Sequence, residues 1–162
     1  MGRVLIISAT KGTNLSLANK IGNIVSVDHE IINLEDFSMP LYIPNLEIPN
    51  SDIIKIFSNK FIKSKAFIFC APEYNGGSPP ILTNAITWLS VITSDFRDLF
   101  SNKKALISTH SGGAGFRFLS TFRVQLEHLG VIVFPRNIIV NRNKQFSNQS
   151  AKKIIKEFEK LL

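Results

Sequence analysis

Five short apolar runs constrain the fold of this chain more than any other feature of its sequence. They are rich in β-branched and aromatic residues, as β-strands are, and lie at residues 4–7, 30–34, 66–70, 105–108 and 131–134. Four of them lack the alternation of polar and apolar residues that a half-exposed strand shows. Continuous apolar runs are typical of parallel strands that are covered on both faces. We therefore predict five strands of a parallel sheet.

Apolar residues recur at helical spacing in the segments between and after these runs. The helical stripes run from Leu17 to Val25, from Ile53 to Phe61, from Ile81 to Ile92, from Leu119 to Leu129 and from Ala151 to Leu162. Gly130 follows the fourth stripe directly, where a glycine often ends a helix as its C′ residue. Strands that alternate with helices predict a three-layer α/β sandwich, with helices on both faces of the sheet. Because we find no internal repeat and no linker, we expect a single domain over residues 1–162.

The helix expected after Pro79 is apolar on nearly every side. Only one side of a helix can cover the sheet, so an apolar opposite side needs another partner. We therefore predict an oligomer with this helix near the subunit interface.

Residues 35–50 contain Pro40, Pro44 and Pro49 and have neither helical nor strand periodicity. This composition predicts a long loop. We favour a loop that wraps the surface or contacts another subunit over a lid on a functional site.

The chain carries 19 Lys and Arg against 12 Asp and Glu, a net charge of +7. Such an excess is compatible with nucleic acid, an anionic membrane surface or a phosphorylated cofactor as partner. The basic residues are scattered, however, and no zinc-finger or RNP-like pattern accompanies them. We therefore expect no nucleic-acid partner.

Cys70 is the single cysteine, so no disulfide can form within the chain. This fits a reducing compartment. No apolar stretch approaches the roughly 20 residues that a membrane-spanning helix needs, and the first apolar run is too short for a signal peptide. We expect a cytoplasmic protein with no membrane partner.

Three loops that follow predicted strands differ from ordinary connections. They comprise residues 8–14 after the first strand, 73–78 after the third and 110–115 after the fourth. In a parallel α/β sheet, ligands bind beyond the carboxyl ends of the strands, near the point where the strand order reverses. Because these strand ends share one edge of the sheet, we expect the three loops to form one site.

The first loop has the composition of an anion-binding site. Its residues are Ser8, Ala9, Thr10, Lys11, Gly12, Thr13 and Asn14. The hydroxyls, the amide and the lysine suit a phosphate, and the glycine lets the main chain approach closely. Free N–H groups at the start of the following helix would add further donors. The alternative is that Thr13 serves only as the N-cap of that helix. The loop matches neither the Walker pattern nor the dinucleotide-binding pattern.

The loop after the third strand places Tyr74 beside Asn75-Gly76-Gly77. A tyrosine next to main chain without bulky side chains is suited to flank a flat aromatic ligand, while main-chain N–H groups meet its polar edge. The alternative is a tight turn with a tyrosine that packs into the core.

The loop after the fourth strand contains Gly112, Gly113 and Gly115, which give the main chain room at the same edge. A flexible loop without function is the alternative. Taken together, a phosphate cradle, an aromatic flank and a glycine-rich rim describe a site for flavin mononucleotide (FMN).

The same segments resemble those of the NAD(P)H-dependent FMN reductases, a family of the flavodoxin-like fold that includes quinone, chromate and azo-dye reductases. The stretch Pro72-Glu73-Tyr74-Asn75-Gly76, followed by Pro79 and Asn84-Ala85-Ile86, is similar to the most specific signature of the family. The loop from Ser8 to Asn14 resembles its phosphate loop, and Ser111-Gly112-Gly113 resembles its fourth-strand loop. The resemblance extends to about residue 135.

The resemblance implies a flavodoxin-like sandwich with a five-stranded parallel sheet, and it implies a homodimer or homotetramer. It assigns binding of the FMN phosphate to Ser8, Thr10, Lys11, Gly12, Thr13 and Asn14. It assigns one side of the flavin ring to Pro72, Glu73, Tyr74, Asn75 and Gly76, and the opposite rim to Ser111, Gly112 and Gly113.

The reaction that the resemblance implies is hydride transfer from NADPH or NADH to FMN. Electrons then pass to a small-molecule acceptor: a quinone, a flavin, an azo compound or a metal oxyanion. We name no catalytic side chain and no metal ligand, because the cofactor carries the chemistry. We interpret His110 as a structural residue at a strand end. The alternatives are a non-enzymatic flavin electron carrier, which the basic net charge disfavours, and a scaffold or regulatory domain without the cofactor.

Four residues depart from the family pattern. Thr10 stands where an arginine is common, so we expect Lys11 to supply the positive charge at the phosphate. Gly77 and Pro80 alter the small-residue pattern after Gly76, and Thr87 replaces a frequent acidic residue. These differences concern FMN affinity and substrate choice rather than the presence of the site.

Overall fold

The computed structural model describes residues 3–45 and 52–162. Within these ranges five strands form one parallel sheet in the order β2-β1-β3-β4-β5. The strands are β1 (Arg3–Ser8), β2 (His29–Asn33), β3 (Ser64–Cys70), β4 (Lys104–His110) and β5 (Ile132–Val140). The order reverses between β1 and β3, as in the flavodoxin-like arrangement. The predicted parallel sheet is therefore confirmed.

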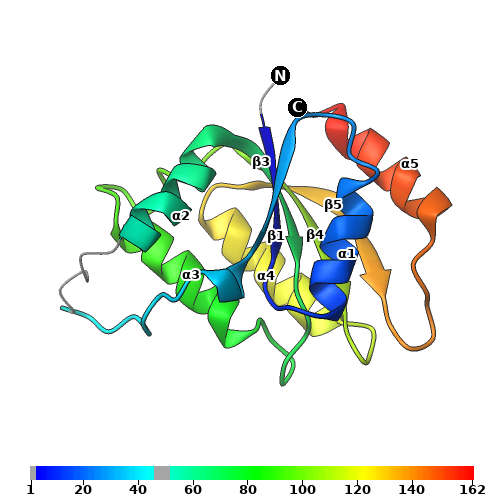
Figure 1. Ribbon diagram of the computed structural model, residues 1–162, viewed down its shortest axis with the longest axis horizontal. Coiled ribbons are helices and arrows are strands. Elements are labelled where there is room, and N and C mark those ends of the chain that lie inside the picture. Colours follow the sequence, from blue (N-terminus) through cyan, green and yellow to red (C-terminus); the bar gives the residue numbers. More distant parts are fainter. Residues whose placement is uncertain (1–2, 46–51) are drawn as a thin grey trace.

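Helices cover both faces of the sheet (Figure 1). Helices α1 (Thr13–Gly22) and α5 (Asn148–Glu159) pack on one face. Helices α2 (Asp52–Lys63), α3 (Pro80–Val91) and α4 (Phe116–His128) pack on the other, and a short 3₁₀ helix, η1 (Leu34–Asp36), follows β2. This is the predicted three-layer sandwich of the flavodoxin-like class. Among the described residues, no helix combines the length and the apolar character that crossing a bilayer would require.

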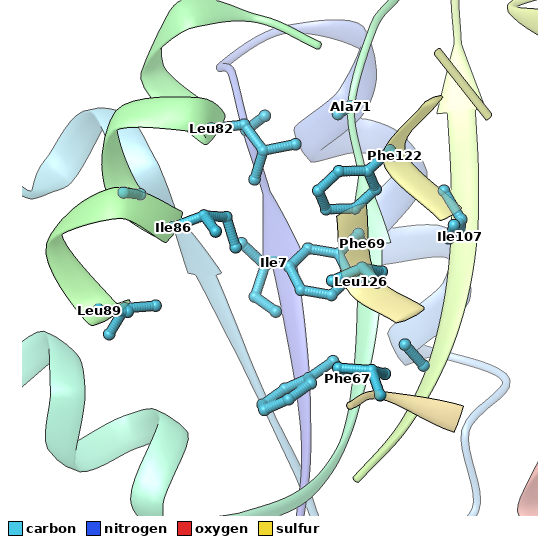
Figure 2. Close-up of a cluster of buried hydrophobic side chains, with 14 of the residues drawn as sticks. Ile7, Phe67, Phe69, Ala71, Leu82, Ile86, Leu89, Ile107, Phe122 and Leu126 are labelled. Atoms are coloured by element: carbon cyan, nitrogen blue, oxygen red, sulfur yellow. The ribbon is translucent and has the colours of Figure 1, made fainter. Parts of the chain in front are cut away.

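Aromatic and aliphatic side chains fill the core between the sheet and helices α3 and α4 (Figure 2). Phe69 of β3 packs edge-on against Phe122 of α4, with ring centroids 5.0 Å apart. Leu82 and Ile86 of α3 close the same cluster and are almost fully buried. A tightly packed core of this kind holds the strand ends, and therefore the loops that follow them, in fixed positions.

Strand β5 is longer than the predicted run at residues 131–134. It continues through Pro135 to Val140, and its pairing register with β4 shifts between Ala105 and Ile107. Because β5 lies at the edge of the sheet, a proline and a register shift are tolerated there. The apolar run in the sequence stops at Phe134 because Pro135 and Arg136 occupy this irregular stretch.

The proline-containing loop wraps over α3, as predicted for the part that the structure describes. The indole N–H of Trp88 donates to the carbonyl oxygen of Pro40 at 2.7 Å, and the Tyr42 ring packs edge-on against Trp88 at 5.4 Å. Asn84 accepts from the Tyr42 N–H at 2.9 Å and donates to the Pro40 carbonyl at 3.0 Å. A loop of the same chain thus covers Trp88 of α3, the helix for which we expected a second subunit as partner. Pro49 lies outside the described residues.

Gly130 ends α4 as predicted. Its φ of 83° is in the left-handed region. Its N–H donates to Glu127 at 2.9 Å, and the Val131 N–H donates to Leu126 at 3.0 Å. These two bonds form a Schellman motif, which satisfies carbonyl groups at the end of the helix.

Candidate functional site

Four loops lie at the carboxyl edge of the sheet, on the lower side of Figure 1. They surround a cavity of about 520 Å³. The loops follow β1, β3, β4 and β5. The lining residues are Thr10, Lys11, Thr13, Asn14, Pro72, Glu73, Tyr74, His110, Ser111, Gly112, Asn141, Arg142 and Gln145. The cavity therefore joins all three predicted loops and adds a fourth, at the point where the strand order reverses.

The start of α1 is suited to an anion. Gly12 is the N-cap residue, with a φ of 77°, and among the described residues no side chain caps the helix. Thr13 is the first helical residue rather than the N-cap, so the capping alternative is wrong. The first N–H groups of α1 therefore retain their capacity to bind a ligand phosphate. A side chain at Gly12 would meet no described atom within 4 Å, so the approach is open, and the positive φ favours glycine.

Ser8 shapes the first loop from beneath the cavity. Its side chain is buried, and its hydroxyl donates to the Thr10 carbonyl oxygen at 2.7 Å. It does not belong to the cavity lining, whereas Thr10 does. The structure therefore places Ser8 as a support for the loop, and its predicted contact with a phosphate stays a prediction.

Asn14 joins the first loop to the end of β4. Its side-chain NH₂ donates to the His110 carbonyl oxygen at 2.9 Å, and its side-chain oxygen accepts from the His110 N–H at 3.0 Å. Asn14 is 1% exposed. The amide that we expected to face a phosphate is thus engaged in a buried pair of hydrogen bonds.

Lys11 contacts one carboxylate through its ammonium and a second through its main chain. Its ammonium lies 3.3 Å from Asp36, and its main-chain N–H donates to Glu35 at 2.7 Å. Both acidic residues belong to η1, after β2. The positive charge expected from Lys11 is therefore partly neutralised within the protein.

The loop after β3 forms a tight turn at its tip. The Tyr74 N–H donates to Gly77 at 3.0 Å, and the Gly77 N–H donates to Tyr74 at 2.9 Å. Asn75 and Gly76 have φ values of 50° and 76°, the signs that a type I′ turn requires. The turn alternative is thus correct for the main chain, but Tyr74 is 49% exposed rather than packed in the core. Asn75 and Gly76 lie beside the cavity lining and not in it.

Glu73 connects the third loop to α4. Its main-chain N–H donates to the Ser111 hydroxyl at 2.8 Å, and its carboxylate accepts from the N–H of Phe118, the third residue of α4, at 3.0 Å. A carboxylate at a helix N-terminus is stabilised by the free N–H groups and by the helix dipole. Glu73 and the buried Pro72 therefore form a fixed wall of the cavity.

The loop after β4 supplies Ser111 and two exposed glycines. The Ser111 hydroxyl also lies 2.8 Å from the Thr109 hydroxyl, and its main-chain N–H donates to Val140 of β5 at 3.1 Å. Gly112 lines the cavity, whereas Gly113 does not. Hydrogen bonds therefore tie this loop to the loop after β3 and to β5.

The loop after β5 is the part of the site that the sequence analysis missed. It contributes Asn141, Arg142 and Gln145 to the cavity. The sequence feature that could have indicated this loop is the polar segment Asn141-Arg142-Asn143-Lys144, which is typical of a turn after a strand. It was overlooked because the fifth strand was predicted to end at residue 134, six residues before the observed end.

Two reactive side chains near the strand ends differ in their access to the cavity. His110 lines the cavity while its main chain is bound by Asn14. Cys70 is buried, and its Sγ lies 3.1 Å from the Ser108 hydroxyl. Burial raises the pKa of the Cys70 thiol to about 12, against the lowering effect of the Ser108 hydrogen bond. Cys70 is therefore a packing residue, as its place at the end of an apolar strand suggests.

The residues present fit an FMN molecule. An uncapped helix start and the Thr10 and Thr13 hydroxyls suit a phosphate, and the exposed Tyr74 ring beside a turn offers a flat apolar surface. The cavity volume lies in the range of about 300–1,000 Å³ that is usual for small-molecule sites. No described side chain blocks the main chain at Gly12.

Comparison with known proteins agrees with this site. The family model for NADPH-dependent FMN reductases matches residues 3–145. Among solved structures, the chain is similar to FerB, a flavoenzyme NAD(P)H:(acceptor) oxidoreductase from Paracoccus denitrificans, at 17% identity and a TM-score of 0.78, covering 99% of this chain and 95% of FerB. It is also similar to an oxidoreductase from Corynebacterium diphtheriae, at 13% identity and a TM-score of 0.82, covering 99% and 96% of the two chains.

An azoreductase from Bacillus anthracis str. Sterne is similar at 14% identity and a TM-score of 0.67, with 99% of this chain and 97% of that chain covered. At such low identities, these structural matches establish the fold. The family follows from the model match, which spans most of the chain and every loop of the cavity. The chain therefore belongs to the NADPH-dependent FMN reductase family and is an FMN-dependent oxidoreductase.

Proposed function

We propose that the protein binds FMN in the four-loop cavity and passes electrons from NADPH or NADH to a small-molecule acceptor. In this proposal the phosphate lies at the start of α1, near Thr10 and Thr13. The flavin ring lies beside Tyr74 and the Asn75-Gly76 turn, with Gly112 on the opposite rim.

One observation carries the proposal: hydrogen bonds between loops hold an anion-binding helix start and an exposed aromatic side chain at the same cavity. Asn14 binds the main chain of His110, and the Glu73 N–H binds the Ser111 hydroxyl. These contacts preorganise the site, so a ligand would order few additional residues on binding.

The protein residues bind and orient the cofactor in this proposal. The redox chemistry, which takes a hydride from NAD(P)H and delivers electrons to an acceptor, is supplied by FMN when it is bound. Tyr74, half exposed at the rim, would cover the edge of a planar ligand. The main-chain N–H groups at the start of α1 would hold the phosphate. The wall formed by Pro72 and Glu73 would limit how far the flavin ring enters the cavity.

The acceptor belongs to the classes of a quinone, a flavin, an azo compound or a metal oxyanion. The solved structures to which the chain is similar support this range, because one is described as an oxidoreductase with an unspecified acceptor and another as an azoreductase. A rim formed by Tyr74 and exposed glycines offers few side-chain hydrogen-bonding groups that would select one acceptor. Such a rim suits acceptors of several kinds.

A homodimer or homotetramer in the cytoplasm completes the proposal. Leu41 and Ile43, on the loop over α3, are 73% and 54% exposed, and Val91 at the end of α3 is 42% exposed. Apolar side chains gathered on neighbouring segments are typical of a subunit interface. The free thiol of Cys70 fits a reducing compartment.

The experiment that tests the proposed function is a visible absorption spectrum of the purified protein with added FMN, recorded without oxygen before and after addition of NADPH or NADH. We expect saturable FMN binding and bleaching of the flavin by the pyridine nucleotide, followed by recovery of colour when a quinone is added. A sample of free FMN with the same reagents is the control. A bound flavin that keeps its oxidised spectrum would indicate an electron carrier instead, and absence of FMN binding would indicate a domain without the cofactor.

A further inference from the structure

The lysine of the first loop, which we expected to bind the phosphate, already has an acidic partner in the protein. The Lys11 ammonium is 3.3 Å from the Asp36 carboxylate, and a second carboxylate, that of Glu35, accepts the Lys11 N–H. The Asp36 carboxylate therefore competes with a bound phosphate for the lysine ammonium, whereas Glu35 meets only the main chain. A phosphomonoester carries up to two negative charges, which the dipole of α1 compensates only in part.

Arg142 brings a second cationic side chain to the same cavity from the loop after β5. It is exposed and lines the cavity together with Thr10 and Thr13. Within residues 3–45 and 52–162, its guanidinium makes no ion pair and no hydrogen bond with the protein. Glu73, the carboxylate of the cavity lining, is engaged with the Phe118 N–H at 3.0 Å. Among the described residues, Arg142 is therefore the cationic side chain of the lining that has no acidic partner, whereas Lys11 has one.

The main chain holds Arg142 on a rigid turn. The Asn141 N–H donates to Lys144 at 2.9 Å, the Lys144 N–H donates to Asn141 at 3.2 Å, and the Asn143 N–H donates to the Asn141 side chain at 2.9 Å. The guanidinium is therefore attached to a braced four-residue turn rather than to a loose loop.

A chain of hydrogen bonds also fixes this turn relative to the start of α1. Val140, which precedes the turn, pairs with His110 in the sheet and accepts the Ser111 N–H at 3.1 Å. The main chain of His110 is in turn bound by Asn14, the second residue of α1. The base of the Arg142 side chain and the N–H groups of the helix thus keep a constant relative position.

We propose that Arg142 is the cationic ligand of the FMN phosphate, in the role that the sequence analysis assigned to Lys11. This inference rests on the proposed function and adds to it a residue from a loop outside the predicted site. A guanidinium is suited to this role because its fork of N–H donors matches the oxygens of a phosphate, and because it stays charged at all relevant pH values.

The test compares FMN with riboflavin, which lacks the phosphate, as ligands of Arg142→Gln. We expect the Kd for FMN, measured by quenching of flavin fluorescence, to rise about 10- to 100-fold, as for the loss of hydrogen bonds to a charged group. The Kd for riboflavin should stay unchanged, and the salt dependence of FMN binding should weaken. Arg142→Lys, which keeps the charge but loses the fork, should show an intermediate loss.

Lys144→Gln is the matched control, because Lys144 lies on the same turn, carries the same charge and does not line the cavity. We expect it to bind both flavins as the unmodified protein does. Equal effects of Arg142→Gln and Lys144→Gln on FMN would overturn the inference, and so would an equal loss of FMN and riboflavin in Arg142→Gln. Either result would leave the proposed function intact, provided that the unmodified protein binds FMN. An unmodified protein that binds no FMN would overturn both.

Discussion

The side-chain amide of Asn14 and the main chain of His110 form two hydrogen bonds, 2.9 and 3.0 Å long, between segments 96 residues apart in the sequence. Strands β1 and β4, from which these segments emerge, are not neighbours, because β3 lies between them. Asn14 therefore reaches across the end of β3 and holds the first and fourth loops together.

Replacing Asn14 by Ala should lower both stability and cofactor affinity. The change removes the side-chain partners of the partly buried N–H and carbonyl of His110, which costs about 1 kcal/mol of unfolding free energy. It also releases the start of α1 from β4, so the Kd for FMN should rise. Denaturant unfolding and FMN titration measure the two effects. Asn19→Ala, at an exposed position of the same helix, is the control and should change neither.

Replacing Glu73 by Ala should destabilise the start of α4. The carboxylate accepts the Phe118 N–H at 3.0 Å, and loss of such a cap costs about 1 kcal/mol. Glu73→Gln keeps an acceptor oxygen but loses the charge near the helix dipole, so its cost should be smaller. Thermal unfolding without FMN separates the two variants. Glu127→Ala, which removes an exposed carboxylate 3.8 Å from Arg123, should have almost no effect. A similar loss in Glu127→Ala and Glu73→Ala would contradict the capping role.

Replacing Gly115 by Ala should destabilise the protein because of both strain and a steric clash. Gly115 has a φ of 69°, and an added Cβ would lie 2.9 Å from Cγ2 of Thr109. We expect a loss of about 1–3 kcal/mol in unfolding free energy, measured in denaturant without FMN. Gly112→Ala, in the same loop, is the control, because a Cβ there would meet no described atom within 4 Å. Equal losses for the two variants would show that the strain at Gly115 is not the cause.

Lys103 should make stability depend on pH in the alkaline range. Burial lowers the pKa of Lys103 from 10.5 to about 8, with a smaller contribution from the charge of Lys65. Between these two pH values the unfolded chain binds a proton that the folded chain does not, so the free energy of unfolding should rise as the pH increases from about 8 to about 10.5. Because Lys103 is only partly buried, solvent screens its charge, and the rise attributable to it is on the order of 1 kcal/mol.

Urea unfolding at several pH values between 7 and 10.5 measures this rise, which should begin near the pKa of Lys103 in the folded protein. The ammonium of Lys103 donates to the Phe61 carbonyl oxygen, and Lys103→Met removes the titrating group. We expect the variant to lack the rise, whereas Lys104→Met, the neighbouring control, should retain it. The idea fails if Lys103→Met and the unmodified protein show the same pH dependence.

The strands and helices could be predicted because their signals are local. Apolar residues at consecutive or helical positions mark the elements, and Gly130 marks the end of α4, since these patterns depend only on near neighbours. The sequence also predicted that three loops meet at one cavity. They contribute the uncapped helix start after Gly12, the exposed Tyr74 and the loop that contains Ser111 and Gly112.

The partners of individual side chains could not be predicted in the same way. The Asn14 amide was expected to face a ligand and instead binds His110, and the Lys11 charge was expected to be free and instead lies beside Asp36. The partner of each side chain depends on which loop lies opposite to it. The strand order decides that placement, and residues nearby in the sequence do not.

Local periodicity in the chain decided the layers and the strand count, because burial on a sheet or a helix imposes a repeat that neighbouring residues must obey. Tertiary packing alone decided that β5 extends past Pro135, that its loop brings Arg142 to the cavity and that Pro40 covers Trp88. The physical reason is that such contacts depend on register, bulges and loop paths, which are set by residues tens of positions apart.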